Sequence, residues 1–488
     1  MNALSPSTSA AALLTALAAL STSTVEAAPS TPPAEASDSA WRAQPPPLGP
    51  SPKLVLPTFQ KATLDNGLTV LVARLNRLPL VAFQLVTKGG AALDPAEAHG
   101  LGNLIYGMLG EGAGSRSALA FSDAVADLGG SFSSGSGRDR GSVSISGLSR
   151  HSEALAQLLA DAVLRPRMES AAFDRLKART LAGLQARLGS PQGLAFLRLP
   201  TLLYGADHPL GHPPSGTLES LPGIGLEDVD THRKLLLDPK RSAFVAVGNI
   251  TLEAGVALAQ RHFGSWTAPD APPLTIPPVE ARERSQIVFI DKPGSPQTMA
   301  VLGRPLFGRG HPQEQALSLA NQAWGGSFSS RLNMNLREEK GYTYGAGSQV
   351  SFRNSVGVFV AYAALQRVFS APGLKEFFVE LTDLETKPLS DEEIERVRTG
   401  LVRSLPGDFE GIGNLAGAAA QIFAYDLPLD HYARLAARIE STTADEVRAA
   451  ADAFLDPGVM QVLMVGDAKT VVPALEGLGF SPITRVEP

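Results

Sequence analysis

Hydrophobic positions along the chain follow strand spacing and helix spacing in turn, and the same succession occurs twice. Short apolar runs typical of strands occur at residues 68–72 and 81–86, and again at 286–290 and 298–301. The helical period is found at residues 100–110, 153–164 and 169–188, and again at 313–324, 371–385 and 390–404. Alternating strands are expected at 142–147 and 356–362. The pattern predicts an α+β fold of two homologous α/β-sandwich repeats, each a mainly antiparallel sheet covered on one face by helices.

Two sequence echoes support a duplication. The hexapeptide GGSFSS occurs at residues 129–134 and 325–330, and FVAVGN at 244–249 is similar to VLMVGD at 462–467. Both echoes occur in the same order, roughly 200 residues apart. A Pro-rich stretch separates the halves. We therefore expect repeats at residues 58–268 and 285–480, joined by a linker at 269–284.

The N-terminal residues are typical of an exported protein. Residues 10–20 form a short apolar core, followed by the small-residue site Val25-Glu26-Ala27-Ala28. No basic residue precedes Arg42, so a disordered tail rich in Ala, Ser and Thr is the alternative. We expect a signal peptide at 1–28, a Pro/Ala-rich linker at 29–57, and a periplasmic or secreted protein. No run reaches the ~18 apolar residues of a membrane span.

Charge and cysteine content exclude some functions. The net charge is −6 and no run of Lys or Arg occurs, so nucleic acid is not an expected partner. The chain has no cysteine, which excludes disulfides, thiolate nucleophiles and thiolate metal sites.

One helix has the frame of a metal motif without its ligands. Asn103, Tyr106 and Gly107 stand at i, i+3 and i+4 in the helix expected at 100–110 and share one face. His, Glu and His at these positions would form H-x-x-E-H, the inverted zincin motif. Asn offers only a weak carbonyl oxygen, Tyr a phenol of pKa near ~10, and Gly no side chain. The alternative role for Asn103 and Tyr106 is packing or hydrogen bonding.

Other residues offer little support for catalysis. His208 and His212 are four apart, but the prolines and glycine of HPLGHPP prevent a helix, which leaves only a loop pair. His99 lies beside the degenerate helix and is otherwise an exposed loop residue. No G-x-S-x-G elbow occurs, so a serine hydrolase site has no local support.

Several motifs together resemble the pitrilysin/insulinase family of zinc peptidases, the inverzincins, from about residue 60 to 470. They are LDNGLTV at 64–70, HPLG at 208–211, VGN at 247–249, HFGSW at 262–266 and GGSFSSRLNMNLREEKGYTYG at 325–345. The resemblance implies that the family's distant Glu ligand falls at Gly183, or at Ala182 with a one-residue slip. All four ligand and base positions are then degenerate, so no metal site is expected in this chain.

The resemblance also implies a substrate-binding role for four residues. Arg337 and Tyr344 match the family's Arg/Tyr pair, which binds the substrate backbone and helps the developing oxyanion. The alternative is that Arg337 pairs with Glu338 or Glu339 and that Tyr344 belongs to the core. Ser133 and Ser134 replace the usual Asn-Ala pair of the strand to which peptides add.

In two-chain members of this family, one chain carries zinc and the other carries the Arg/Tyr pair. We therefore expect a non-catalytic subunit that contributes chamber wall and the Arg/Tyr pair to a zinc-binding homologous peptidase subunit for peptide hydrolysis. Zinc is expected in the partner only, and this chain is expected to be inactive alone. The alternative is a peptide-binding or structural scaffold without a protease role. A self-sufficient hydrolase would need a site that the sequence does not contain.

Overall fold

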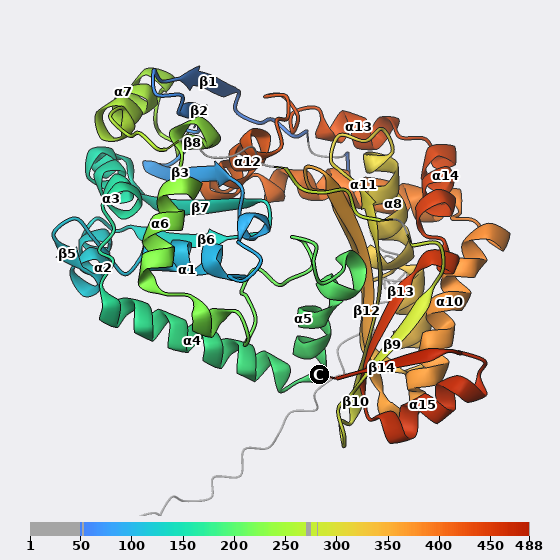
Figure 1. The fold of residues 1–488 in the computed structure, drawn as a ribbon. Coiled ribbons are helices and arrows are strands. Elements are labelled where there is room, and N and C mark those ends of the chain that lie inside the picture. The colour runs from blue at the N-terminus through green and yellow to red at the C-terminus, as the bar shows by residue number, and fades with distance from the viewer. Residues whose placement is uncertain (1–48, 51–52, 270–274, 281, 488) are drawn as a thin grey trace, which may run out of the picture. The chain divides into compact units, whose positions relative to one another are not determined.

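Two mixed sheets organise the residues that the structure describes (Figure 1). The structure is a computed structural model that describes residues 49–50, 53–269, 275–280 and 282–487. The expected signal peptide, most of the first linker and part of the second lie outside the described residues. All helices and strands belong to one unit, residues 51–488.

The first sheet has the strand order β1-β2-β8-β3-β7-β6 and the second has β11-β12-β10-β13-β9-β14. The strands of the first sheet are β1 Phe59–Thr63, β2 Thr69–Arg74, β3 Leu80–Lys88, β6 Ser131–Ser136, β7 Arg140–Leu148 and β8 Ser242–Gly248. Those of the second are β9 Gln286–Asp291, β10 Gln297–Phe307, β11 Thr343–Ser351, β12 Val356–Gln366, β13 Gln461–Gly466 and β14 Ile483–Val486. A small hairpin is formed by β4 Gly112–Ala113 and β5 Arg116–Ser117.

The two sheets repeat one topology. In each, the last central strand (β8 or β13) is parallel to one neighbour (β2 or β9) and antiparallel to the other (β3 or β10). The echo at 244–249 and 462–467 therefore marks equivalent strands. The GGSFSS echo does not. Its first copy leads into edge strand β6, whereas its second ends a π-helical turn, Gln322–Gly326, and precedes a helix.

The helices pack around these sheets, and they confirm the predicted α+β class. In the first half they are α1 Leu101–Met108, α2 Ala118–Asp127, α3 Ser152–Leu164, α4 Ser170–Leu188, α5 Pro191–Tyr204, α6 Leu226–Leu236 and α7 Leu252–Phe263. In the second they are α8 Glu314–Asn321, α9 Arg331–Asn333, the π-helical Met334–Glu339, α10 Ser370–Thr386, α11 Asp391–Asp408, α12 Ile412–Ala424, α13 Leu435–Ser441, α14 Ala444–Phe454 and α15 Ala468–Gly477. Among the described residues, none of these helices has the length and apolar character needed to cross a membrane.

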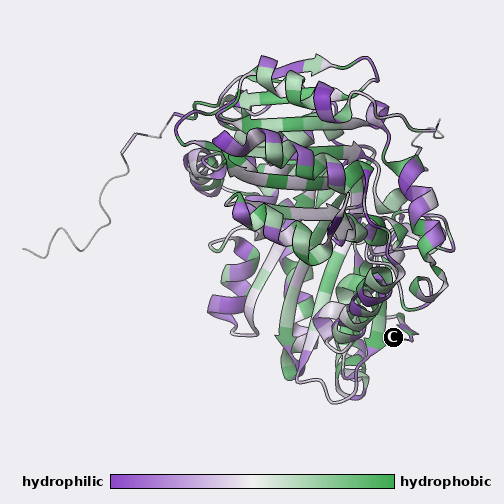
Figure 2. Cartoon of the chain, turned by 90° about the vertical axis from the view of Figure 1, so that its left-hand side faces the viewer, coloured by the Kyte–Doolittle hydropathy of each residue, from purple (hydrophilic) through white to green (hydrophobic). Residues whose placement is uncertain are grey.

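Each sheet buries its two faces against different helices. One face packs on helices of its own half, and hydrophobic residues, drawn green in Figure 2, run along the strands. The opposite face packs on a helix of the other half. Helix α5 places Leu194, Leu199 and Leu203 on β10 and β13, and helix α12 places Leu415 and Ala419 on β3 and β8. The sequence did not predict this exchange of helices.

An ion pair anchors the segment after the second GGSFSS copy to helix α11. Arg331 donates to both carboxylate oxygens of Glu393, at 2.6 and 2.7 Å, and each side chain is under one-fifth exposed. Arg331 also donates to the carbonyls of Lys387 and Pro388. Burial acts to raise the pKa of Glu393, but the bonds from Arg331 and Ser390 outweigh it and lower this pKa to about 2.

We expect Glu393→Gln to lower the free energy of unfolding by about 2 kcal/mol at pH 7, because it leaves Arg331 without its counter-charge. A carboxyl whose pKa falls on folding stabilises the native state above its unfolded pKa. That stabilisation is lost as the pH falls from about 4.5 toward 2, so the difference from wild type should narrow there. Urea unfolding at pH 7 and pH 3.5 measures it, with exposed Glu476→Gln as the control. An equal difference in unfolding free energy between wild type and Glu393→Gln at both pH values would contradict the role of the charge.

Candidate functional site

The degenerate motif lies on α1, whose start is held by a buried carboxylate. Asp94 accepts hydrogen bonds from the backbone N–H groups of Gly100 at 2.7 Å and Gly102 at 2.8 Å, which caps the helix. Burial raises the pKa of Asp94 to about 7, against the lowering effect of these bonds. Gly100 has φ of 98°, a backbone conformation in which a residue with a β-carbon would be strained. Its carbonyl accepts a hydrogen bond from the backbone N–H of Leu104. This turn fixes the direction in which α1 presents residues 103–107.

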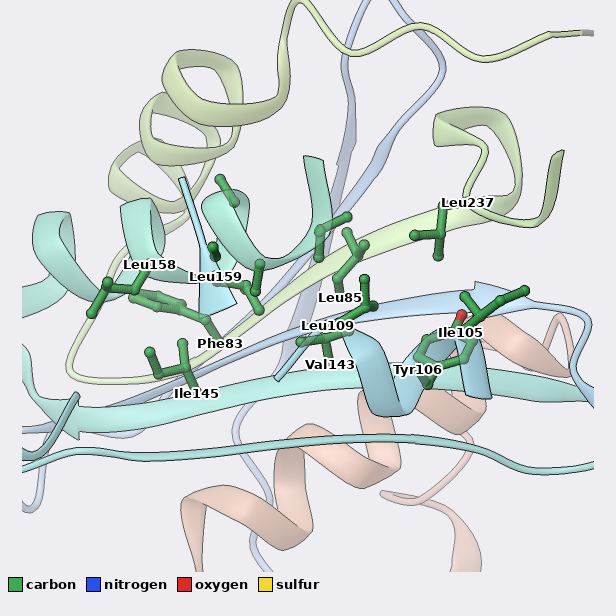
Figure 3. Close-up of a cluster of buried hydrophobic side chains, with 14 of the residues drawn as sticks. Phe83, Leu85, Ile105, Tyr106, Leu109, Val143, Ile145, Leu158, Leu159 and Leu237 are labelled. Carbon is green, nitrogen blue, oxygen red and sulfur yellow. The ribbon is translucent and has the colours of Figure 1, made fainter. Parts of the chain in front are cut away.

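Tyr106 does not lie on the rim of a site but inside the hydrophobic core. Its side chain is 1% exposed and lies in the core near Val143 of the first sheet (Figure 3). A β-carbon on Gly141 of β7 would lie 2.0 Å from Cζ of the Tyr106 ring, so the ring depends on glycine at that position. Its hydroxyl forms no well-aligned hydrogen bond among the described residues, and burial raises the pKa of the phenol against a lowering effect of the neighbouring Thr87.

The other three motif positions provide no strong zinc ligand. Asn103 is half-buried on α1, and Gly107 faces α4, where a β-carbon would meet Leu176 at 2.8 Å. Gly183 on α4 faces open space. One amide, one buried phenol and two glycines do not fit a zinc ion, which needs imidazole, thiolate or carboxylate donors. Across the described residues, no three His, Cys, Asp or Glu side chains come together as a metal site.

Ion pairs link α4 to the residue Glu111, which lies shortly after the degenerate motif. Glu111, which follows α1, is 3.2 Å from Arg179 and 3.6 Å from Arg175 of α4. Both arginines are more than half exposed, so the pairs are worth at most about 1 kcal/mol each. The sequence analysis did not predict this contact, although Arg175 and Arg179 stand one turn apart in the sequence of α4.

Strand β6 is the edge strand of the first sheet and carries Ser133 and Ser134 on opposite faces. Ser134 donates to the carbonyl of Tyr106 at 2.7 Å and so ties β6 to α1. Ser133 is exposed. The ladder of β6 is formed with β7 alone, which leaves its outer edge without a strand among the described residues. Such an edge can accept an extended peptide.

The second half brings Arg337 and Tyr344 together on the surface. The guanidinium carbon of Arg337 lies 5.1 Å from the ring centroid of Tyr344 and 4.5 Å from that of Phe328. Tyr344 is 87% exposed and Phe328 is 65% exposed. The expected alternative, a core position for Tyr344, is wrong. Arg337 does pair with Glu338, at 3.2 Å.

A bulge in edge strand β11 and a buried asparagine position this cluster. The register of β11 against β12 shifts between Thr343 and Ala346, which turns Tyr344 outward. Asn333 accepts from the backbone N–H of Ala346 at 3.0 Å and donates to the carbonyl of Phe328 at 2.7 Å. Asn333 thus ties the backbone at Phe328 to β11 two residues after Tyr344. Sequence reasoning included Asn333 and Phe328 in the motif at 325–345 but assigned a role there only to Arg337 and Tyr344.

The histidines form no catalytic arrangement. His208 interacts with the carbonyl of Pro277 at 3.1 Å and with the backbone N–H of Leu210, which is a loop-fixing role. His212 stacks on His99 with ring centroids 3.4 Å apart. Burial, and then the proximity of His212, lowers the pKa of His99. The pair lines a cavity of about 690 Å³ together with Asp94 and Arg198.

Family models match both halves of the chain. The model for insulinase (peptidase family M16) matches residues 69–208, and the model for the peptidase M16 inactive domain matches residues 223–401. A protein of Rickettsia felis described as an uncharacterized zinc protease is 26% identical over 71% of this chain and 83% of its own. A similarly described protein of Mycobacterium tuberculosis is 25% identical over 80% of this chain and 90% of its own.

Solved structures share the fold. A peptidase M16 inactive domain from Pseudomonas fluorescens superposes with a TM-score of 0.79 at 24% identity, covering 84% of this chain and 98% of its own. A protease from Helicobacter pylori gives a TM-score of 0.78 at 18% identity, covering 84% and 100%. With the α1 frame, the repeated sheet topology and both family models in agreement, the chain belongs to the insulinase family, peptidase family M16, as a member whose zinc motif is degenerate.

Proposed function

We propose that this chain is the non-catalytic subunit of a two-chain zinc peptidase. The observation that carries the proposal is a contrast between the halves. The first half has lost every strong ligand at the motif positions. The second half keeps Arg337 and Tyr344 in contact and at the surface, supported by Asn333. A separate homologous chain would supply zinc and the general base, and this chain would bind the peptide.

The chemistry of the pair suits a peptide carbonyl during hydrolysis. A guanidinium presents several N–H donors in a fixed plane, and a phenol adds another. Donors held in place before reaction stabilise an oxygen that gains negative charge more than one that stays neutral. Phe328 and Tyr344 flank the guanidinium and restrict its orientation.

The edge of β6 provides a second contact for the peptide under this proposal. An added strand would bond to backbone groups of β6, and the small side chains Ser133 and Ser134 permit close approach. We also propose export to the periplasm or outside the cell, on the basis of the apolar core at residues 10–20.

Co-expression with a homologue that carries intact His-x-x-Glu-His tests the proposal. We expect the two chains to co-purify, with zinc in the complex at one per pair and peptide hydrolysis that a chelator abolishes. This chain purified alone should hold no stoichiometric zinc and show no peptidase activity. Co-purification without any gain in activity would favour a scaffold role instead. Chelator-sensitive hydrolysis by the single chain would contradict both.

A further inference from the structure

A second cavity lies in the second half of the chain. Arg337 and Tyr344 belong to the same half but do not line this cavity. Its volume is about 1150 Å³, and α8, the end of β11, α11 and residues 421–439 line it. We call it the arginine pocket, because Arg309, Arg353, Arg434 and Arg438 all line it. The residues that line it do not include Arg337, Tyr344 or Phe328.

The arginine pocket carries an excess of positive charge. Its four guanidinium groups meet two carboxylates, Glu314 and Asp430. Each carboxylate is already engaged by one arginine: Arg309 is 3.0 Å from Glu314, and Arg434 pairs with Asp430. Arg353 and Arg438 have no carboxylate within ion-pair distance in the described part of the chain. Burial lowers the pKa of Arg438 and Glu314 acts on it at longer range to raise it, but neither arginine has a direct ion-pair partner among the described residues, and an anion in the cavity would stabilise both.

Hydrogen-bond donors in the pocket are also unsatisfied. Nε of Arg309, Nη1 of Arg353 and Nε of Arg438 are buried and lack a partner among the described residues. Arg438 donates instead to His431, whose pKa burial and the neighbouring Arg438 and Arg309 lower to about 4. His431 is therefore neutral and accepts from a cation. A small rotation of each guanidinium would present its free donor to an oxygen in the cavity.

The position of the pocket along β11 indicates the kind of anion. Tyr344 stands near the start of β11, and Ser348 to Arg353 at its end line the pocket. Arg353 lies nine residues after Tyr344, so at about 3.3 Å per residue an extended peptide would span the roughly 30 Å between them with about nine residues. The cavity is far larger than a single phosphate needs, and Phe352, Tyr425 and Tyr432 give it apolar walls.

We propose that the arginine pocket binds Asp or Glu side chains of a peptide whose chain runs along β11. The proposal rests on the peptide-binding function proposed above and narrows it to acidic peptides. Arg353 and Arg438 supply guanidinium groups that lack a direct ion-pair partner among the described residues, and Arg434 adds an exposed donor. The pocket recognises the carboxylates of the peptide about nine residues away from the peptide residue that lies at Arg337.

Fluorescence anisotropy with the purified full-length chain tests this without any partner subunit. The probes are two labelled, acetylated and amidated decapeptides that differ only in carrying four Glu or four Gln. We expect the Glu peptide to bind at least about tenfold more tightly, and the preference to fall as salt rises. Arg353→Gln should weaken the Glu peptide about fivefold to tenfold and leave the Gln peptide unchanged.

Arg485→Gln, on exposed β14, removes the same charge outside the pocket and should change neither affinity. The proposal would be overturned if the two peptides bound with equal affinity. It would also be overturned if Arg485→Gln weakened the Glu peptide as much as Arg353→Gln does. Displacement of the Glu peptide by an equal concentration of inorganic phosphate would assign the pocket to free anions and also overturn it. Thermal unfolding of Arg353→Gln confirms that the variant is folded. A failure to find a zinc-bearing partner leaves this binding result intact.

Discussion

Arg337→Ala in the two-chain peptidase that we propose is expected to lower kcat/KM for peptide hydrolysis by roughly 10²-fold to 10³-fold, the usual loss when one oxyanion donor is removed. Arg337 contacts both Tyr344 and Phe328, and its side chain is 29% exposed, so alanine removes the charge without opening the core. Steady-state kinetics with a quenched peptide, together with the co-purified ratio of the two chains, measure the effect. Assembly should not change.

Glu338→Ala is the matched control for Arg337. It removes the ion-pair partner of Arg337 at 3.2 Å and leaves the guanidinium in place. If Arg337 were only one half of a surface ion pair, the two alanine variants would behave alike. Arg337→Lys keeps the charge but loses the planar set of donors, and we expect it to recover little activity. Full activity of Arg337→Ala would show that the pair has no role in the reaction.

Tyr106→Glu, which restores the base of the lost motif, is expected to destabilise the chain by about 4 kcal/mol or more. The change removes a fully buried ring and places a carboxyl among Ile105, Leu109 and Val143 (Figure 3). Loss of a buried aromatic ring alone costs about 3–5 kcal/mol, and burial of an unpaired carboxyl adds to it. Urea unfolding monitored by circular dichroism measures the loss.

Tyr106→Phe separates the effect of the ring from that of the hydroxyl. The hydroxyl forms no well-aligned hydrogen bond in the described part of the chain, with Thr87 as its polar neighbour, so its removal should be neutral or stabilise the protein by up to about 1 kcal/mol. A stable Tyr106→Glu variant would show that the ring is not held as the structure has it. The expected results mean that the degenerate site is now part of the core, and that single substitutions do not return it to a metal site.

Local sequence patterns predicted the helices and strands better than they predicted which sheet each helix packs against. The strands at 68–72 and 81–86 and the helix at 100–110 are found as β2, β3 and α1 with small changes of bounds. Periodicity shows that a helix has an apolar face, but not which sheet covers it. Helix α5 was therefore missed as a bridge between halves, and α12, rich in Ala and Gly, was not predicted at all.

The candidate site shows the same limit. Spacing placed Asn103, Tyr106 and Gly107 on one helix face, which the structure has, but burial depends on Gly141, which lies 35 positions later on another strand. Arg337 and Tyr344 were paired by resemblance to a family. Their support by Asn333 depends on a bulge, and no short-range pattern of residues predicts where this bulge falls.

The exchanged helices α5 and α12 restrict how the protein can move. To part the two halves, the chain would have to strip Leu194, Leu199 and Leu203 from one sheet and Leu415 and Ala419 from the other at the same moment. Each large aliphatic side chain re-exposed to water costs about 1.5–3 kcal/mol, so a hinge of this kind would stay closed under ordinary conditions. In the two-chain peptidase that we propose, the opening that admits a peptide would therefore form between the two chains, and this chain would stay rigid.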